Sequence, residues 1–566
     1  MSEARSKQTN YYVGIDLGTT NSVAAIGVID AATRYVRPEV VPMLTNTHPQ
    51  PIVPSVVMYR PKGHPVVGFA AKESLKQPQP PGGCIIRSVK LDMDKAWVPG
   101  FEEMIRPVSV SADILKKLKS GIEHTIKHTV IDIVIGVPAC FTPDMCTATE
   151  SAAREAGFQN VQLTVEPKLA LLDFIYEQNR LAPEARVLDL SKPCVAAIVD
   201  IGGGTTDVSI VQFHESEREV AGKRVPVIYY TELGLSRFTR LAGDNFDALV
   251  ADYLAEQFWR QTGIRIDAIS PEAERRFARN RILELAEVAK QRLSREVEDL
   301  MTFSDLNLEQ AMQQATIEVV MPFIVGPHSA QIQFTYPQFA EIVAPLMGHG
   351  LTPSDLGNPE VMKQADSEEC TSIILPILNA LNKARKEVGS TPKISAVLVN
   401  GGMAKVHVIR QRLAEFFGVN VDSIIEVPSP DLSVARGAVL QHYNTAHDLD
   451  EARYVLPEAI CLQHASGFDL LFEAGTKYPI KEPKRIDYFA IPRDRCPHFD
   501  FFLYRGYPNP VGQLAVHRVD FRQGRLPNRG ERVVFEMTID ANRNIQVKAW
   551  LKDEPNRIYP IEIRLK

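Results

Sequence analysis

The sequence predicts an α/β fold that is built from a duplicated unit and followed by a small all-β domain. The duplication is predicted by two stretches, Tyr11 to Asp30 and Cys194 to Phe213, which each place aspartate, glycine and two threonines between two apolar strands. The all-β domain is predicted because the chain from about His447 onwards consists of short strand patterns that turns separate.

The segment Asp200 to Asp207, which we call the second clasp, is typical of a phosphate-binding turn. Gly202, Gly203 and Gly204 lack a Cβ atom, so the backbone can bring several N–H groups against an anion. Two aspartates could face a phosphate only through a hard cation such as Mg²⁺, because carboxylate and phosphate repel each other. Taken alone, the same stretch could also be a glycine-rich hairpin with exposed aspartates.

The first clasp repeats this pattern with Asp16, Gly18, Thr19 and Thr20. In both clasps a strand follows the turn, where a Rossmann fingerprint would need a helix. No GxxxxGK[ST] string occurs in the chain. The sequence therefore argues against a dinucleotide-dependent dehydrogenase and against a P-loop enzyme.

The region between the clasps predicts two strand–helix units. A strand over Ile131 to Val137 precedes a helix that Thr142 caps and that ends at Ala156. A second strand, 161–165, is followed by Glu166-Pro167 as a turn and by a helix over 168–178. Glu166 then lies at the C-terminal end of a strand, where open α/β sheets place ligand-binding groups.

Later segments add a helix face and a glycine pair. Glu287, Lys290 and Ser294 are spaced i, i+3 and i+7 on a long helix that Ser270-Pro271 is expected to cap. A solvated surface is the ordinary reading of such a charged face. Gly401 and Gly402 follow a strand and allow the close approach of a flat or anionic ligand. Asp431 is expected to be the N-cap of the next helix.

Composition restricts the possible partners. The 566 residues carry a formal net charge of −6, and no basic run with interleaved aromatic residues occurs, so a nucleic-acid partner is not expected. The seven cysteines form no CxxC pair, which favours free thiols. No run of 18 apolar residues occurs and the N-terminus has no apolar signal region, so we expect a cytoplasmic protein without a membrane partner.

Six motifs together resemble those of the heat-shock-protein-70 (DnaK-like) chaperones, which are actin-like ATPases. GIDLGTTNS and VDIGGGTTDVS match the family's two phosphate motifs, and VLVNGGMAKV matches its adenosine motif. VPACFTPD and VEPKLAL match its connecting motifs, and TIDANRNIQVKA matches a hairpin of its peptide-binding β domain. The resemblance covers roughly residues 11 to 566.

The resemblance implies a domain order. Residues 1–10 are a polar tail, and residues 11–445 form a duplicated actin-like (ribonuclease H-like), two-lobed ATPase domain. Residues 446–457 are a linker, and residues 458–566 form a β-sandwich domain that resembles the peptide-binding domain and has no helical lid. The implied cofactors are ATP or ADP and Mg²⁺, with K⁺ as a further possible cation.

The family's site residues can be placed on this chain one by one. The implied catalytic residues are Lys90, Glu166, Asp200 and Thr205. Mg²⁺ would be held, mostly through water, by Asp16, Asp200 and Asp207. The implied nucleotide-contacting residues are Gly18, Thr19, Thr20, Gly202, Gly203, Gly204, Thr205, Glu287, Lys290, Ser294, Gly401, Gly402, Lys405 and Asp431. The resemblance therefore implies that the helix face of Glu287, Lys290 and Ser294 binds the nucleotide and is not merely a solvated surface.

Four departures from the family pattern affect the coupling between the domains. The linker HDLDEARYVL lacks the family's run of leucines, which puts its docking on the ATPase domain in doubt, and Cys146 stands where an arginine is usual. Met403 and Lys405 replace a serine and an arginine of the adenosine motif, and Gln291 replaces a frequent arginine or aliphatic residue. We expect no helical lid after the β domain.

Three functions therefore compete. The first is a slow ATPase and chaperone whose nucleotide state controls binding of unfolded or extended apolar polypeptide, with a J-domain co-chaperone and a nucleotide exchange factor as implied partners. The second is a nucleotide-binding adaptor or exchange-factor-like protein with little or no turnover. The third is an actin-like sugar or metabolite kinase, against which the terminal β domain argues.

Overall fold

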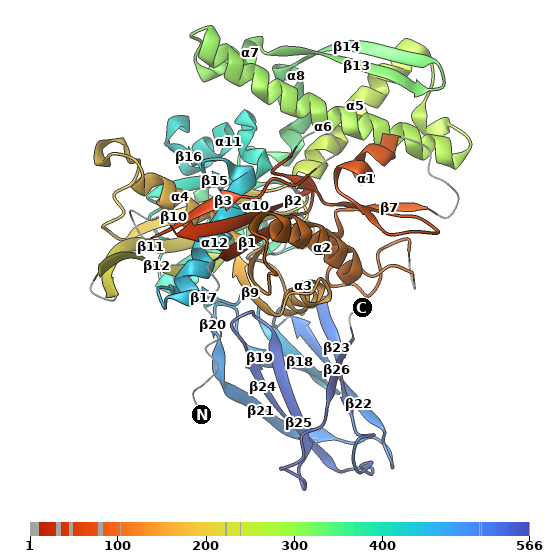
Figure 1. Ribbon diagram of the computed structural model, residues 1–566, viewed down its shortest axis with the longest axis vertical. Coiled ribbons are helices and arrows are strands. Elements are labelled where there is room, and N and C mark those ends of the chain that lie inside the picture. The colour runs from red at the N-terminus through yellow and green to blue at the C-terminus, as the bar shows by residue number, and fades with distance from the viewer. Residues whose placement is uncertain are drawn as a thin grey trace.

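The computed structural model describes residues 11–29, 35–44, 49–76, 83–101, 104–220, 223–237, 239–367, 370–508, 510 and 512–564. The expected polar tail at 1–10 lies outside these residues. Helices and strands alternate through the first four fifths of the chain, and strands alone follow, so the fold is mixed α/β (Figure 1). All seven cysteines are free thiols. Among the helices of the described residues, none combines the length and the apolar character of a membrane span.

The first large sheet carries the first clasp. Its strands, in the order β3-β2-β1-β8-β9, are Val36–Val40, Asn21–Ile29, Tyr12–Leu17, Asp132–Val137 and Asn160–Val165. β1 runs antiparallel to β2 and parallel to β8. Because helices cover both faces, β1 and β8 are almost continuously apolar, as buried strands of α/β proteins are.

The second large sheet carries the second clasp. Its order is β16-β15-β10-β11-β12-β17-β20, with strands Ile424–Glu426, Ala396–Asn400, Cys194–Ile201, Thr206–Val220, Lys223–Leu235, Glu451–Val455 and Lys477–Tyr478. β10 runs antiparallel to β11 and parallel to β15. The order and the directions of β12-β11-β10-β15-β16 are therefore those of β3-β2-β1-β8-β9 in the first sheet.

Two helices fill the space between the sheets. α12 (Pro430–Ala446) packs Val439 on the first sheet, and α4 (Glu166–Asn179) packs Phe174 and Ile175 on β10 of the second sheet. On the outer face of the first sheet lie α2 (Pro107–Ile126) and α3 (Pro143–Glu155). α10 (Ile374–Val388) and α11 (His407–Phe417) join the core on the outer face of the second sheet.

Two smaller units extend the large sheets. One contains α5 (Gly243–Thr262), α6 (Glu272–Phe303), α7 (Leu308–Gln314), the hairpin β13 (Thr316–Val325) and β14 (His328–Thr335), and α8 (Tyr336–Val343). The other contains β4 (Val53–Pro54), β5 (Val56–Tyr59), β6 (Val66–Val67), α1 (Phe69–Glu73) and β7 (Cys84–Arg87). In Figure 1 the α5–α8 unit lies at the top, and α1 lies beside α6.

The local predictions hold except at the starts of α4, α6 and α12. α3 begins at Pro143, and Thr142 Oγ1 accepts a hydrogen bond from the Met145 N–H, as the sequence predicts. The turn expected at Glu166-Pro167 is wrong, because α4 begins at Glu166 and holds Pro167 in its first turn, where its missing N–H is harmless. Asp431 is not a cap either. Ser429 is the N-cap of α12, and Asp431 lies inside the first turn.

The helix that carries Glu287 is long, as the sequence predicts, but its cap differs from the prediction. α6 runs from Glu272 to Phe303, and Pro271 is its N-cap without any side-chain hydrogen bond. The expected cap by the Ser270 side chain therefore does not form.

The last part of the chain is a separate group of strands, which we call the β unit. One sheet contains β19 (Gly467–Phe472), β18 (Ile460–His464), β22 (His498–Arg505), β23 (Gly512–Asp520) and β26 (Ile561–Arg564). The other contains β21 (Ile480–Ala490), β24 (Arg532–Ile539) and β25 (Ile545–Leu551). Side chains of both sheets share one core, and the predicted turn at 540–544 joins β24 to β25.

The segment before the β unit docks in spite of its unusual sequence. β17 pairs in parallel with β12 and antiparallel with β20, whose Tyr478 packs in the core of the β unit, so it joins the second sheet to the β unit. The N–H of Val455 donates to Glu232 Oε2 at 2.8 Å, and Lys168 Nζ donates to Asp450 Oδ1 at 2.5 Å. Backbone pairing and buried polar contacts take the place of the leucine contacts that the sequence lacks.

The contact between α12 and α4 allows a test of the core. A Cβ at Gly437 would lie 1.9 Å from the Leu169 carbonyl oxygen. Gly437→Ala should therefore overpack the interface, cost about 1–3 kcal/mol and lower the midpoint of thermal unfolding by several degrees. Gly357→Ala is the matched control, because no atom lies within 4 Å of its Cβ position. Equal melting curves for the two variants in a calorimeter would contradict this packing.

Candidate functional site

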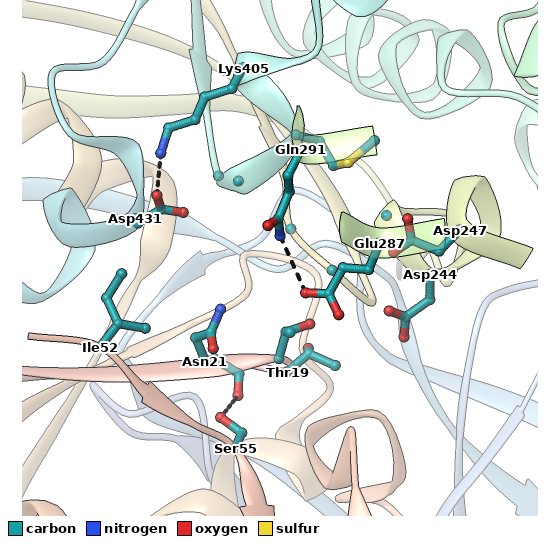
Figure 2. A pocket seen from close by; sticks show the side chains of 18 of the residues that line it. Thr19, Asn21, Ile52, Ser55, Asp244, Asp247, Glu287, Gln291, Lys405 and Asp431 are labelled. Atoms are coloured by element: carbon teal, nitrogen blue, oxygen red, sulfur yellow. Dashed lines mark hydrogen bonds and ion pairs between the residues drawn. The ribbon is translucent and has the colours of Figure 1, made fainter. Parts of the chain in front are cut away.

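A cavity of about 860 Å³ opens between the two large sheets and the α5–α8 unit. Its wall contains both clasps, the residues around Lys90, one face of α6 and the first turn of α12. Figure 2 shows Lys405 and Asp431 on one side of this cavity, Glu287, Asp244 and Asp247 on the other, and Thr19 between them. The volume lies within the usual range of small-molecule sites.

The two clasps meet at one end of the cavity. Asp16 and Asp200 occupy equivalent positions near the ends of β1 and β10. A Cβ on Gly203 would lie 1.9 Å from Thr20 Oγ1, and one on Gly204 would lie 2.5 Å from Thr19 Cγ2. The glycines are therefore needed for the turns to face each other at this distance.

Lys90 lies at the centre of a group of buried carboxylates. The short helix Val89–Asp92 carries it, and its Nζ donates to Glu166 Oε1 at 2.5 Å. Both side chains are at most 10% exposed. Burial opposes the charge on Lys90, but the carboxylates of Glu166 and Asp16 outweigh burial and raise its pKa above the ordinary value. The amine is therefore held as a cation.

The aspartates of this group resist ionisation. Burial, together with the charge of Glu166, raises the pKa of Asp16 to about 7 and that of Asp200 to about 8. A hydrogen bond from Asn400 Nδ2 to Asp200 Oδ2, 2.8 Å long, acts in the opposite direction. One lysine does not balance these carboxylates, so the site favours a further cation.

Asp207 is the last residue of the second clasp. Burial and Glu166 raise its pKa to about 6, and hydrogen bonds from Cys140 lower it. Its Oδ1 accepts the backbone N–H of Cys140 at 3.3 Å. Cys140 belongs to the segment between β8 and α3, so this bond joins the second clasp to the connection between the two units.

The opposite end of the cavity is formed by α6 and the loop after β15. Lys290 Nζ pairs with Asp247 Oδ1 at 2.7 Å, and Lys405 pairs with Asp431. Gly401 has φ = 81°, which a residue with a side chain rarely adopts, and its backbone lies against Ile201 O. This end combines the glycine pair 401–402 with charged side chains.

Two hydroxyls in the cavity wall are ready to bind a ligand. Thr20 Oγ1 and Ser294 Oγ are buried, and neither has a hydrogen-bond partner among the described residues. Buried polar atoms are normally paired, so orphaned atoms that line a cavity indicate a polar ligand. One lies in the first clasp and the other at the α6 end.

Most of the predicted site residues lie around this one cavity. Those in its wall are Asp16, Gly18, Thr19, Thr20, Lys90, Glu166, Asp200, Gly202, Gly203, Thr205, Glu287, Lys290, Ser294, Gly401, Gly402, Lys405 and Asp431. Gly204 and Asp207 are not in the wall. Gly204 packs against Thr19, and Asp207 accepts the backbone N–H of Cys140.

Sequence reasoning missed several residues of the wall. Asn400 is not among the predicted residues, yet it bonds to Asp200 and accepts from Ser433 Oγ at 2.8 Å. Its position directly before Gly401 was the available signal. Asp244 and Asp247 begin α5 and face the cavity, but their spacing is that of an ordinary helix start.

The carboxylates are spread out rather than gathered. Within the described ranges, no three His, Cys, Asp or Glu side chains form a direct metal-binding group. Asp16 and Asp200 face the cavity from different sheets, with Lys90 between the carboxylates. This donor set, made of oxygen atoms only, suits a hydrated Mg²⁺ that keeps most of its water.

Comparisons with known proteins agree with this arrangement. A family model described as "Hsp70 protein" matches residues 84–334. The chaperone protein DnaK of Thermotoga petrophila is 26% identical over 560 residues, which is 97% of this chain and 79% of that protein. The chaperone protein DnaK of Thermotoga sp. strain RQ2 is similar to the same extent. The chain is therefore similar to DnaK proteins over nearly its whole length and to the Hsp70 family model over residues 84–334.

Proposed function

We propose that this protein binds and hydrolyses ATP and that the nucleotide state controls its binding of extended apolar polypeptide, as in an Hsp70-type chaperone. The observation that carries the proposal is the pair of facing clasps around a buried Lys90–Glu166 ion pair. Paired glycine-threonine turns suit phosphates, and a buried lysine among carboxylates suits phosphoryl transfer.

The phosphate end of the cavity supplies the binding groups. Thr19 and Thr20 of the first clasp hold the terminal phosphates from one side, and Gly202 to Thr205 contact them from the other. The orphaned Thr20 hydroxyl supports this assignment, since a phosphate oxygen gives it a partner. Asp16 and Asp200 bind Mg²⁺ through its waters, and the metal neutralises phosphate charge when bound.

Lys90 has the central catalytic role. Its amine is buried, and the carboxylates around it keep it charged, so it is preorganised to orient a water molecule and to offset negative charge on the terminal phosphate. Glu166 fixes the amine of Lys90 through its 2.5 Å hydrogen bond. Asp207 holds the second clasp in place through its hydrogen bond with the Cys140 N–H. Thr205 contributes its hydroxyl beside them.

The adenosine lies at the α6 end of the cavity. Glu287, Lys290 and Ser294 face it from one side, and the glycine pair 401–402 also lines this end. The orphaned Ser294 Oγ supplies a hydrogen bond to the base or the ribose. Lys405, which is paired with Asp431 without a nucleotide, reaches over the base with its aliphatic stem.

The strand order supports the proposed domain assignment. The two large sheets repeat one five-strand order with the same directions, which supports a duplicated actin-like ATPase domain over residues 11–445. The linker is 446–457, and 458–566 form a β-sandwich domain for polypeptide. J-domain and nucleotide-exchange proteins are the expected partners.

Lys90→Ala tests the hydrolytic part of the proposal. Loss of the buried cation should lower the steady-state rate of ATP hydrolysis by about two to three powers of ten, because a preorganised charge at the terminal phosphate is lost. Phosphate release is measured without any added acceptor. Lys95→Ala is the control, since this lysine pairs with Asp92 on the same short segment outside the cavity wall and should leave the rate nearly unchanged.

The outcomes separate the competing functions. Calorimetric binding of ATP without turnover in the wild-type protein would favour the adaptor function. Phosphate transfer that requires a sugar or metabolite acceptor would favour a kinase. Equal rates for wild-type protein and Lys90→Ala would rule out the catalytic role of this lysine.

A second prediction concerns peptide binding. β17 joins the second sheet to the β unit, so a change of the bound nucleotide should alter the conformation of both. The affinity for a labelled apolar heptapeptide, measured by fluorescence anisotropy, should be about tenfold lower with ATP than with ADP, which corresponds to a coupling free energy of about 1.4 kcal/mol. The Lys90→Ala variant keeps ATP intact during the titration. Equal affinities would show that the nucleotide does not control the β unit.

A further inference from the structure

Arg543 has an unusual environment for an arginine. It occupies the tight turn between β24 and β25 with φ = 67°, and only 2% of its surface is exposed. An arginine is rarely buried unless its donors are satisfied, and a positive φ is unfavourable for any residue with a side chain. The contacts of the guanidinium must therefore compensate for both.

Those contacts cross from the β unit to the connection between β8 and α3. Nη1 of Arg543 donates to Ala139 O and to Phe141 O, each at 2.8 Å. Nε and Nη2 donate to the Tyr478 hydroxyl at 3.2 and 2.9 Å. The cation is thus stabilised by carbonyl and hydroxyl dipoles of both units.

One peptide group joins this contact to the cavity. The carbonyl of Ala139 and the N–H of Cys140 belong to the same planar peptide unit. Its oxygen accepts from Arg543, and its N–H donates to Asp207 Oδ1 at 3.3 Å. Donation to the oxygen fixes the plane of the peptide and strengthens its N–H as a donor. Two bonds and one rigid group therefore separate the guanidinium from the second clasp.

The packing around Cys146 explains why this position on α3 has a cysteine. Cys146 and Arg543 line the same small cavity with Tyr478. A long cationic side chain at residue 146 would compete for the space that the guanidinium occupies. The positive charge that the sequence lacks at Cys146 is here provided from the β unit.

We propose that Arg543 is a positioning residue for the ATP site: through the Ala139–Cys140 peptide it holds Asp207, so that docking of the β unit adjusts the second clasp. This inference rests on the proposed ATP hydrolysis and names a regulatory contact of the same site. It concerns one side chain, whereas the rest of the turn makes only docking contacts.

The neighbours of Arg543 provide the comparison for this claim. Asn542 Oδ1 accepts from the Leu163 N–H at 2.9 Å, and Thr147 Oγ1 donates to Asn544 Oδ1 at 2.9 Å. These contacts end on α3 and β9 and do not involve the Ala139–Cys140 peptide. Loss of one of them weakens docking without releasing that peptide.

Arg543→Gly is the central variant, because glycine accepts the positive φ and the turn is not strained. The kcat of ATP hydrolysis should fall by about fivefold, the effect of losing one hydrogen bond at Asp207, while KM for ATP changes by less than about twofold. Arg495→Gly is the matched control, since Arg495 also has a positive φ of 49° in the β unit but is exposed. It should leave both constants unchanged.

Chemical rescue separates positioning from simple docking. Arg543→Gly leaves a space bounded by two carbonyl oxygens and a hydroxyl, so millimolar guanidinium should restore much of kcat, whereas urea of the same size and shape should not. Asn542→Ala should lower kcat less than Arg543→Gly, and guanidinium should not restore its activity. Thermal unfolding of each variant is followed in parallel.

The failures of the two proposals are distinguishable. If the wild-type protein binds no ATP or releases no phosphate, the proposed function fails before Arg543 is tested. If the wild type is active and Arg543→Gly matches Arg495→Gly, the positioning role is overturned. A higher kcat in Arg543→Gly, an equal loss in Asn542→Ala, or rescue by urea would overturn it as well.

Discussion

The buried ion pair between Lys90 and Glu166 is the interaction on which the rest of the structure depends. Burial and mutual repulsion raise the pKa of the aspartates around it, and the positive charge of Lys90 acts in the opposite direction on Asp16 and Asp207. Such an arrangement is unfavourable for stability alone, because desolvation of charges is rarely repaid in full. It suits the proposed ligand, which would bring a metal to offset the carboxylates and phosphate to meet the glycine-threonine turns.

The two sheets are what bring these groups together. In each, a clasp joins a central strand to its antiparallel neighbour, and a parallel strand lies on the other side. Because the strand orders match, Asp16 and Asp200 come to the same cleft from opposite sides. α4 and α12 set the distance between the sheets, and the absence of a side chain at Gly437 lets their backbones touch. Glu166, as the first residue of α4, is placed by the same packing that holds the sheets together.

The contact between the β unit and the rest of the molecule is polar and specific. It includes a strand, β17, which pairs with strands on both sides, and a turn whose side chains bond to side chains of α3 and to backbone groups of β9 and of the segment after β8. Backbone hydrogen bonds can exchange for water when units separate, so such an interface is more easily reversed than an apolar one. The sequence, which has few leucines in the linker, favours this kind of docking.

The sequence by itself determined most of the local elements and the place of both glycine-threonine turns between strands. Strand alternation, glycine turns and the Thr142 cap are local signals, and they placed the strands and most helix ends correctly. Sequence reasoning failed where packing with other parts of the chain decides the local structure. Glu166 begins α4 and is not part of a turn, and Asp431 lies in the first turn of α12 and is not its cap, because the proline beside each residue fits a first helical turn. Only the tertiary structure showed that Asn400 contacts Asp200, that β17 docks, and that Arg543 reaches the Ala139–Cys140 peptide. These contacts join residues up to about 400 positions apart, and no local pattern records them, since they arise from how the sheets and the β unit pack.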